Sequence, residues 1–421
     1  MTSFICPIKW FTGILSLHHQ KYQLQVLKLL FLANRVPYPP YRGDKLKIFN
    51  LAKRLKDKHE LHLLTFAQSA EDIGYKAELE KIFKVVHFVY LPKWKSAVNC
   101  LAGLWDSKPL QVLYFQSAEL QQQLNAMIAK HSYDAVHVQH LRMSPYLSEC
   151  KDIPRILDLP DAFSLYWERR KTVKRGLLTT LFENAEQARV LKYEQILKEY
   201  NLSLVCSSED LAYLEKIHHT GNLRLLPNGV DMETFSPRDH DYSHNHTLLF
   251  TGNMDYAPNV DAVVYFTSTI LPLIRLKYPQ VKFVIAGQRP VKKVAELAND
   301  KVIVTGFIKD LAATYNSASV VVAPLRFGAG TQNKVLEAMA MGVPVVCSHI
   351  GFGGLGIKSG EGAVMQSDPT AFAKSVIELL ASEEQRRKVG EEGVQVIRSR
   401  FDWDIIALKL EGYFKEVGIR N

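Results

Sequence analysis

The sequence predicts an α/β protein of two doubly wound, Rossmann-like domains that face each other across a cleft. Three observations support this fold class. A chain of 421 residues is too long for one ordinary domain. Short apolar runs alternate with helical patterns almost throughout, which is typical of parallel sheets covered by helices on both faces. The alternation stops in one polar stretch near residue 240 and then resumes, so it divides into two sets.

Residues 26–226 form the first expected domain. Its predicted strands are short, continuously apolar and bounded by polar or turn residues, as expected of strands buried on both faces. They are Lys28–Ala33, Leu61–Phe66, Val85–Leu91, Ala135–Gln139, Arg155–Leu159 and Ser203–Cys206. Apolar residues at helical spacing between Ile48 and Leu55 predict one helix, and we expect Phe163–Tyr200 to be helical as well.

Residues 247–400 form the second expected domain and repeat the scheme. The predicted strands are Thr247–Thr251, Lys282–Ala286, Val302–Thr305, Val320–Ala323, Val343–Cys347 and Ala363–Gln366. The predicted helices are Val260–Tyr278, Asp310–Ala318, Asn333–Met341 and Pro369–Leu380. Residues 227–246 are expected to be a linker, because they lack apolar periodicity. We expect a last helix within 401–421 to pack back on the first domain.

The five cysteines are odd in number and form no CxxC pair, which argues against a disulfide framework and for a reducing compartment. No apolar run reaches the roughly 18 residues of a membrane span. The apolar run Phe11–Leu17 is short and lacks a good cleavage context, so we expect residues 1–25 to be a poorly defined leader or a mis-assigned start. We therefore expect a cytoplasmic protein.

The charge is uneven. Residues 1–225 hold 31 Lys and Arg against 22 Asp and Glu, whereas the remainder holds 21 of each, so the formal net charge of +9 lies in the first half. A basic domain could face a membrane surface, an anionic acceptor or nucleic acid, or its lysines could simply be solvated. No nucleic-acid-binding motif accompanies the charge, so we expect no nucleic-acid partner.

The strongest motif runs from Val320 to Ser348, VVVAPLRFGAGTQNKVLEAMAMGVPVVCS. It predicts a buried strand, a glycine loop, a helix and another strand. Glycines at 328 and 330 allow a tight turn and close approach to a ligand. Thr331 is expected to cap the helix, so that N–H groups at 330–332 and Lys334 point at a phosphate. Glu337, one turn further on, is placed to bind a ribose diol.

The string Glu337–Val346 resembles the donor-site signature of family 4 of the retaining glycosyltransferases, which have the GT-B fold. Leu226–Asp231, Phe250–Gly252 and Pro39–Asp44 resemble other motifs of that family in the expected order. The resemblance covers about residues 26–400. It implies hexosyl transfer from a nucleotide-sugar to a glycan or lipid-linked acceptor, with retention of the anomeric configuration and without an essential metal or cofactor.

By resemblance, His140, Lys334 and Glu337 are the candidate catalytic residues, with His137 as the alternate to His140. The candidate donor-binding residues are Gly43, Gly252, Asn253, Arg326, Gly328, Gly330, Thr331 and Gln332. Two departures from the family pattern stand out. Ala329 replaces a glutamate that helps to position the donor sugar in relatives. Asn253 and Pro258 replace an arginine and a lysine, so the pyrophosphate would depend on backbone N–H groups, Lys334 and Arg326 or Arg289.

The acceptor is expected to meet the first domain at Asp158, Arg169 and Arg170. Asp161 is expected to cap a helix beginning at Ala162. The run Arg169–Arg175 holds five basic residues in seven. It suits a phosphate-bearing lipid acceptor or a membrane surface, or it forms a solvated helix face.

The resemblance places the protein in exopolysaccharide or lipopolysaccharide assembly, in the cytoplasm and possibly peripheral on the inner face of the membrane. Two alternatives remain open: a non-catalytic nucleotide-sugar-binding scaffold of a polysaccharide assembly complex, and a GT-B sugar-nucleotide epimerase. Neither of the DxD triplets, Asp239–Asp241 in the linker and Asp402–Asp404 before the last helix, is expected to hold a metal ion.

Overall fold

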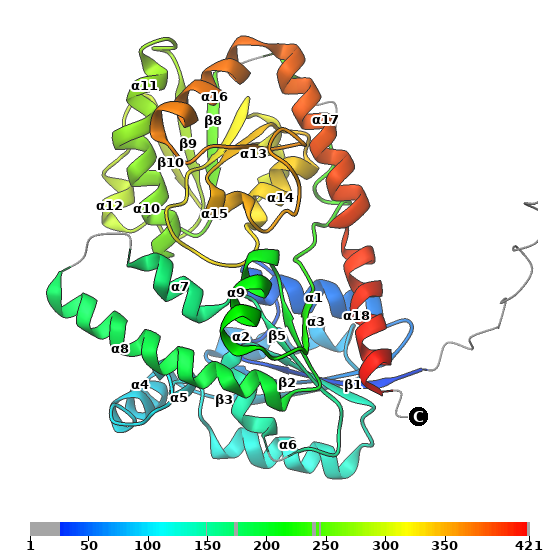
Figure 1. Cartoon of the computed structure of the whole chain (residues 1–421). Coiled ribbons are helices and arrows are strands. Elements are labelled where there is room, and N and C mark those ends of the chain that lie inside the picture. The colour runs from blue at the N-terminus through cyan, green and yellow to red at the C-terminus, as the bar shows by residue number, and fades with distance from the viewer. Residues whose placement is uncertain (1–25, 149, 172–175, 238–240, 244–245, 419–421) are drawn as a thin grey trace, which may run out of the picture.

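The protein is described from a computed structural model that covers residues 26–148, 150–171, 176–237, 241–243 and 246–418. It has two α/β domains, one above the other in Figure 1. The predicted fold class is confirmed, because each domain holds one parallel sheet with helices packed on it. The predicted leader, residues 1–25, lies outside the described residues.

The N-terminal domain contains a seven-stranded sheet in the order β3-β2-β1-β4-β5-β6-β7. Its strands are β1 (Lys28–Ala33), β2 (Glu60–Ala67), β3 (Val85–Tyr90), β4 (Ala135–Gln139), β5 (Arg155–Leu159), β6 (Leu202–Val205) and β7 (Leu223–Leu225). The short edge strand β7 is not among the predicted strands. All strand pairings in this seven-stranded sheet are parallel.

The helices of this domain are α1 (Gly43–Leu55), α2 (Ala70–Gly74), α3 (Lys76–Glu80), α4 (Lys93–Ala102), α5 (Leu110–Leu113), α6 (Ala118–Lys130), η1 (Leu141–Leu147), α7 (Phe163–Arg170), α8 (Leu177–Tyr193), η2 (Glu194–Glu199) and α9 (Ser208–His218). The predicted helical stretch Phe163–Tyr200 is therefore three elements, with residues 172–175 outside the described ones.

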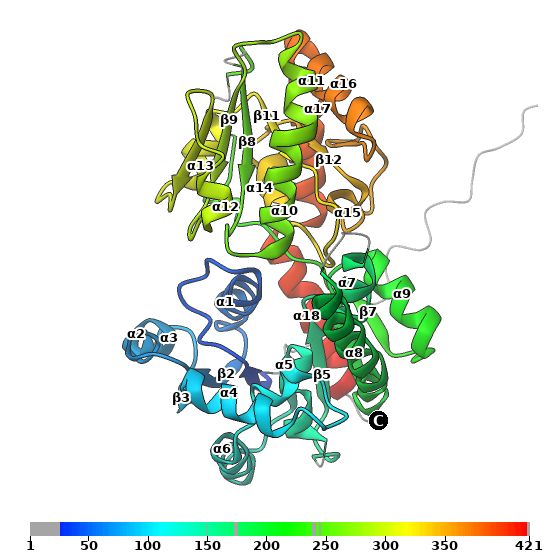
Figure 2. The ribbon, with the colours of Figure 1, turned by 90° about the vertical axis from the view of Figure 1, so that its left-hand side faces the viewer.

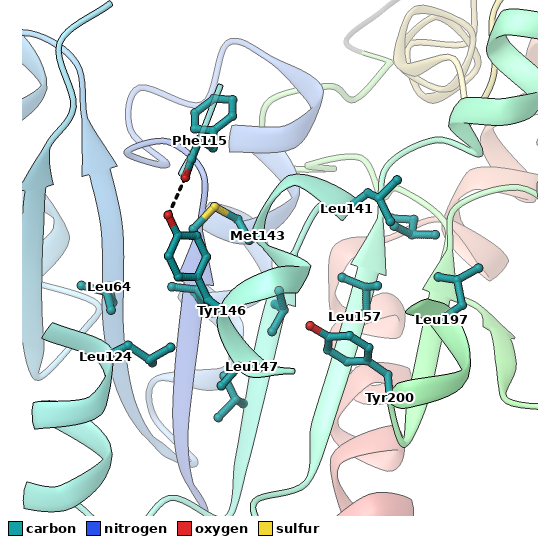
Figure 3. Close-up of a cluster of buried hydrophobic side chains, with 14 of the residues drawn as sticks. Leu64, Phe115, Leu124, Leu141, Met143, Tyr146, Leu147, Leu157, Leu197 and Tyr200 are labelled. Atoms are coloured by element: carbon teal, nitrogen blue, oxygen red, sulfur yellow. Dashed lines mark hydrogen bonds between the residues drawn. The ribbon is translucent and has the colours of Figure 1, made fainter. Parts of the chain in front are cut away.

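Both faces of the N-terminal sheet are buried, which explains why its strands are continuously apolar. Along β1, Leu30 and Leu32 belong to one core cluster, whereas Leu29 and Phe31 belong to the other. Figure 3 shows part of the first cluster, in which η1 packs its apolar side chains against one face of the sheet. In the same cluster the Tyr146 hydroxyl donates to the Phe115 carbonyl at 2.5 Å. This packing fixes the backbone directly after β4.

The C-terminal domain contains a six-stranded parallel sheet in the order β10-β9-β8-β11-β12-β13. Its strands are β8 (Thr247–Thr251), β9 (Lys282–Ala286), β10 (Val302–Gly306), β11 (Val320–Ala323), β12 (Val345–Cys347) and β13 (Val364–Met365). Its helices are α10 (Ala257–Tyr265), η3 (Phe266–Ile270), α11 (Leu271–Arg275), α12 (Lys292–Ala295), α13 (Leu311–Asn316), α14 (Asn333–Ala340), α15 (His349–Phe352), α16 (Pro369–Ala381) and α17 (Glu383–Arg400).

One helical run among the described residues, Ala257–Arg275, is long and apolar enough to cross a membrane. It comprises α10, η3 and α11. Its Val263, Phe266 and Ile270 are buried in the core of the C-terminal domain. We therefore interpret it as a core helix of this domain.

The chain crosses between the domains twice, and the two crossings are hydrogen-bonded to each other. The first leads from β7 to β8, and the second joins α17 to α18 (Trp403–Gly418). The Val230 N–H donates to the Phe401 carbonyl at 2.7 Å, and Val230 pairs with Asp402 as an isolated bridge. Beyond this point α18 packs on α1 and β4, with the Trp403 side chain fully buried in the N-terminal core (Figure 1).

Candidate active site

The six strands of the C-terminal sheet follow the same order as the first six strands of the N-terminal sheet. In each sheet the chain leaves two neighbouring strands toward opposite edges of the sheet, at β1 and β4 in the first and at β8 and β11 in the second. Ligands of doubly wound folds bind at the carboxyl ends of such strands. Four predicted site segments follow these four strands. Gly43 comes after β1, His140 after β4, Gly252 after β8, and the loop 328–332 after β11.

Gly252 lies where only glycine fits. Its φ is +150°, and a Cβ there would approach the Asn259 side-chain amide to 2.6 Å. The neighbouring Asn253 is occupied within its own domain, because its Oδ1 accepts from Gln288 Nε2 at 2.8 Å and its carbonyl accepts from Asn259 Nδ2 at 3.0 Å. Pro258 is buried in the first turn of α10. Neither residue supplies the positive charge that the family pattern has there.

Helix α14 begins at Asn333 with Gln332 as its N-cap, and no side chain caps it. The prediction that Thr331 caps this helix is wrong. Its hydroxyl instead donates to the Cys206 carbonyl of the other domain at 2.6 Å. In the described parts of the chain, no group accepts from the backbone N–H of Gln332, Asn333 or Lys334. These three donors are open to an anion at the positive end of the helix dipole.

The prediction that the N–H groups of residues 330 and 331 point freely into the cleft is also wrong. Gly330 N donates to Asp210 Oδ2 at 3.0 Å, and Thr331 N lies 3.3 Å from Cys206 Sγ. The glycine loop is thus held against the carboxyl ends of the N-terminal strands. Gly330, at φ +73°, has no room for a Cβ, which would lie 2.6 Å from the Pro160 carbonyl oxygen.

Lys334 and Glu337 lie one turn apart on α14. Lys334 Nζ lies 3.2 Å from Gln332 Oε1 and 5.3 Å from the centre of the Phe250 ring. Burial lowers the pKa of Lys334 to about 8, against the opposing influence of Glu337. A cation that is poorly solvated and close to open N–H groups is well placed to stabilise a phosphate.

Glu337 is held by a tyrosine that the sequence analysis did not single out. Its Oε2 accepts from Tyr315 Oη at 2.8 Å, and Tyr315 Oη also lies 2.6 Å from Thr251 Oγ1. Burial raises the pKa of Glu337, while the Tyr315 hydrogen bond and Lys334 oppose the rise. Among the described groups none donates to Glu337 Oε1, so this oxygen is available to a ligand hydroxyl.

His140 has the strained backbone expected of a functional residue, because its φ is +81° and it is not glycine. Its Nδ1 accepts from the Arg142 N–H at 3.3 Å, and its ring stacks on Phe163 with centroids 4.8 Å apart. Burial and the nearby Arg142 and Arg35 lower the pKa of His140 well below its usual range. The imidazole is therefore neutral at pH 7, and because Nδ1 accepts, Nε2 carries the proton and can donate to a ligand.

His137, the alternate to His140, lies elsewhere. It is fully buried in β4, where its Nε2 is 3.2 Å from Asp158 Oδ2. Asp158 also accepts from Lys47 Nζ at 2.6 Å, and Lys47 donates to the Leu226 carbonyl. The expectation that Asp158 meets an acceptor is wrong, because only 1% of it is exposed and it joins α1 to the sheet.

The basic residues predicted to bind ligands are paired with protein groups. Arg169 donates to the Gly328 carbonyl at 3.0 Å and to Glu209 at 2.5 Å, so it links the two domains. Arg170 pairs with Glu183 at 2.6 Å. Arg326 forms two hydrogen bonds with Asp261 and stacks on the Tyr265 ring, and Arg289 lies 3.6 Å from Asp255. None of these contacts places a free guanidinium beside the α14 N-terminus.

A pair of acidic groups lies under the glycine loop. Burial raises the pKa of Asp161 to about 8, with Asp210 adding to the rise, and burial raises the pKa of Asp210 to about 6. The prediction that Asp161 caps α7 is wrong, since that helix begins after Ala162 without a side-chain cap. Asp161 instead lies beside Gly330, and a Cβ on Gly330 would clash with the Asp161 carboxylate.

Gly43 and its loop approach the C-terminal domain directly. A Cβ on Gly43 would lie 3.7 Å from Asn333 Nδ2, and Arg42 lies 3.9 Å from Asp255. Asn228 of the first crossing donates to Asn333 Oδ1 at 2.9 Å. Asn333, in the first turn of α14, is therefore close to both the N-terminal domain and the first crossing.

Sequence reasoning missed Tyr315, Arg142, Asp210 and Cys206. Arg142 stands two residues after His140, and Cys206 directly follows β6, so position at a strand end was an available signal for both. Tyr315 on α13 carries no such signal, because only the folded chain brings it to Glu337. Of the DxD triplets, Asp404 pairs with Arg54, and part of Asp239–Asp241 lies outside the described residues. No three described His, Cys, Asp or Glu residues are grouped as metal ligands.

Comparison with known proteins agrees with the sequence resemblance. Residues 245–382 match a family model described as glycosyl transferases group 1. An uncharacterised 44.6 kDa protein in the cps region of Klebsiella pneumoniae is 22% identical over 395 residues, which are 89% of this chain and 96% of that protein. The D-inositol 3-phosphate glycosyltransferase of Corynebacterium urealyticum is 23% identical over 360 residues, covering 76% of this chain and 80% of that enzyme.

The solved structure of HepE from Anabaena, in complex with UDP and glucose, superposes with a TM-score of 0.65 at 14% identity. The match covers 92% of this chain and 99% of HepE. At this identity the likeness shows a shared fold.

Proposed function

We propose that this chain, a glycosyltransferase of the GT-B fold whose C-terminal domain belongs to the group 1 family, transfers a hexosyl group from a nucleotide-sugar to a glycan or lipid-linked acceptor with retention of configuration. The observation that carries the proposal is the first turn of α14. There the open N–H groups of residues 332–334, the Lys334 ammonium and the free oxygen of Glu337 occur together.

The first turn of α14 matches the charge that develops during transfer. As the bond between the sugar and the diphosphate breaks, the leaving diphosphate gains negative charge. Donors fixed in advance at a helix N-terminus stabilise that charge without reorganisation. Lys334 adds a full positive charge, and Glu337 Oε1 can accept from ribose hydroxyls. Together these groups would bind the phosphates and the ribose of the nucleotide in the C-terminal domain.

The N-terminal domain would supply the acceptor side. His140 is neutral, directly follows β4 at the carboxyl end of the sheet, and would suit a hydrogen bond to the transferred sugar. Gly43 and Asn228 approach Asn333 closely, which fits a closed arrangement of the two domains. Such closure would keep out water that otherwise hydrolyses the donor.

The cellular setting forms part of the proposal. A relative in a cps region fits exopolysaccharide assembly, and a cytoplasmic enzyme at the inner face of the membrane would meet both donor and lipid-linked acceptor. The HepE complex with UDP and glucose makes UDP-sugars the first donors to test.

The test is nucleotide release from a panel of UDP-, GDP-, ADP- and dTDP-sugars, with and without membrane lipid extract. We expect release from one donor class. Lys334→Ala and Glu337→Gln should each reduce kcat/KM by about 100-fold, as loss of one charge-stabilising group does. Lys292→Ala, an exposed lysine of the same domain, should change nothing.

A non-catalytic scaffold is the alternative that this experiment separates. It is motivated by Ala329 and by the glycine loop, whose N–H groups at 330 and 331 are occupied by the other domain. Tight donor binding that both variants weaken, without release under any acceptor, would favour the scaffold. Absence of donor binding would rule out both functions.

A further inference from the structure

Helix α4 of the N-terminal domain exposes a row of large apolar side chains. Trp94, Val98 and Leu101 are spaced by four and three residues, so they share one helix face. Trp94 is 68% exposed, and Trp105, just after the helix, is 98% exposed. Exposed tryptophans are uncommon on soluble proteins, and gathered apolar groups mark interaction surfaces.

The beginning of α8 carries a second exposed group of the same kind. Leu177, Leu178, Leu181 and Phe182 are all exposed, Leu178 by 82%. The next turn behaves differently, since Glu183 and Glu186 are buried against Arg170 and the Leu110 N–H. The helix therefore uses one end for packing and leaves the other end uncovered.

The two groups adjoin each other. The Arg189 guanidinium of α8 donates to the Leu104 carbonyl, and Glu186 accepts from the Leu110 N–H at 2.8 Å, so the segment after α4 is fixed to α8. Glu186 lies four residues, about 6 Å, from Phe182 along the helix. Figure 1 shows α4 and the start of α8 on the same, left-hand side of the domain, and Figure 2, which looks at that side, shows α4 and α8 in front. We call the combined set the apolar face: Trp94, Val98, Leu101, Trp105, Leu177, Leu178, Leu181 and Phe182.

The charged residues within the two segments of the apolar face are lysines, and the exposed Asp106 follows Trp105. Residues 93–105 include Lys93 and Lys95 but no Asp or Glu, and residues 177–182 include no charged residue. The whole net positive charge of the chain belongs to this half. Tryptophan, leucine and lysine together favour the boundary between anionic headgroups and acyl chains, where the rings insert and the ammonium groups meet phosphates.

We propose that the apolar face docks the protein on the surface of an anionic lipid bilayer. This inference rests on the proposed function, because docking on a bilayer would bring the transferase to a lipid-linked acceptor. Helix α8 follows α7, whose Arg169 contacts the donor-site loop at Gly328. A bilayer on the apolar face would thus lie one helical hairpin from the cleft and would present a lipid-linked acceptor to it.

The test is co-sedimentation of the full chain with vesicles of phosphatidylglycerol and phosphatidylcholine, compared with pure phosphatidylcholine. Wild type should bind the anionic vesicles, and its tryptophan emission should shift to the blue. Trp94→Ser combined with Trp105→Ser, and separately Leu178→Ser combined with Phe182→Ser, should each lower the partition coefficient by at least about tenfold. Lys93→Glu with Lys95→Glu should weaken binding most at low salt.

Leu276→Ser is the matched control, because Leu276 is an 84% exposed apolar residue of the other domain. It should bind vesicles like wild type. Equal binding by all variants would overturn the proposal, as would binding that ignores lipid charge. Loss of a concentration-dependent dimer in the variants, without any vesicle binding by wild type, would assign the face to a second copy instead. Donor release measured alongside keeps this outcome separate from failure of the proposed function.

Discussion

Asp161 is a carboxylic acid that the folded protein keeps protonated near neutral pH. Its pKa is raised to about 8 by burial beside Asp210, whereas the unfolded chain releases this proton near pH 4. Between these values the folded state holds this proton and the unfolded state does not, so the contribution of Asp161 to stability falls as pH rises from about 4 to about 8. Above about 8 both states are ionised and this dependence ends.

We therefore predict that Asp161→Asn gains stability relative to wild type as pH rises. The difference in unfolding free energy should grow by roughly 3–4 kcal/mol between about pH 5 and 8. Urea unfolding at the two pH values measures it. Asp300→Asn removes an exposed carboxylate and should leave the pH dependence of wild type intact. A constant difference between Asp161→Asn and wild type would show that Asp161 ionises normally.

The placement of Lys334 and Glu337 on α14 could be predicted from the sequence, but their partners could not. Lys334 and Glu337 could be predicted, because helical spacing puts them on one face behind a glycine loop. Thr331 was assigned to a cap because its type favours that position, yet a contact with Cys206 from a distant strand prevails. Asp158 ends a strand as a ligand-binding residue would, but Lys47, 111 residues away, makes it a core ion pair.

The glycine loop 328–332 needs an unusual backbone conformation and also contacts the N-terminal domain. Gly330 combines φ +73° with a Cβ position blocked by Pro160 and Asp161 of the other domain. Gly221 has a similar φ, +70°, but a Cβ there meets nothing within 4 Å. The two glycines thus share a left-handed backbone conformation and differ in whether other atoms occupy the position of a Cβ.

We predict that Gly330→Ala prevents the domains from closing, whereas Gly221→Ala costs only backbone strain. Gly330→Ala should lower kcat for transfer by about 100-fold. Donor affinity should change little, since Lys334 and Glu337 stay in place. Steady-state kinetics and donor titration separate the two quantities. If Gly221→Ala lost as much activity, strain alone would explain both variants.

Element existence could be predicted better than element limits. Twelve strands were expected from apolar runs, and the thirteenth, β7, has only three residues and too little pattern to be recognised. The stretch Phe163–Tyr200 has helical composition throughout, yet it divides into α7, α8 and η2. The exposed ends of α4 and α8 could not be separated from core helices by sequence, since apolar spacing is the same whether a face is covered or not.

For the whole molecule, α18 is the part that ties the two domains into one stability unit. It belongs to the end of the chain but completes the N-terminal core. Trp403→Ala should therefore cost about 3–5 kcal/mol of unfolding free energy, as for other fully buried large side chains. Leu408→Ala on the same helix, at a 57% exposed position, should cost under about 0.5 kcal/mol. Chemical unfolding of both variants makes the comparison, and similar losses would mean that α18 is not docked.

The paired crossings at Val230 and Asp402 determine how the two lobes can separate. A single connecting segment would leave the two domains free to rotate about three axes. Two strands bonded side by side act as a door hinge, because twisting about the long axis of the molecule would break the Val230–Phe401 hydrogen bond. We therefore expect opening to proceed mainly along one angular coordinate, so that the two domains return to the same relative position each time they close. The paired crossings would therefore help to align the two domains at the reacting carbon, although neither crossing residue touches the substrates.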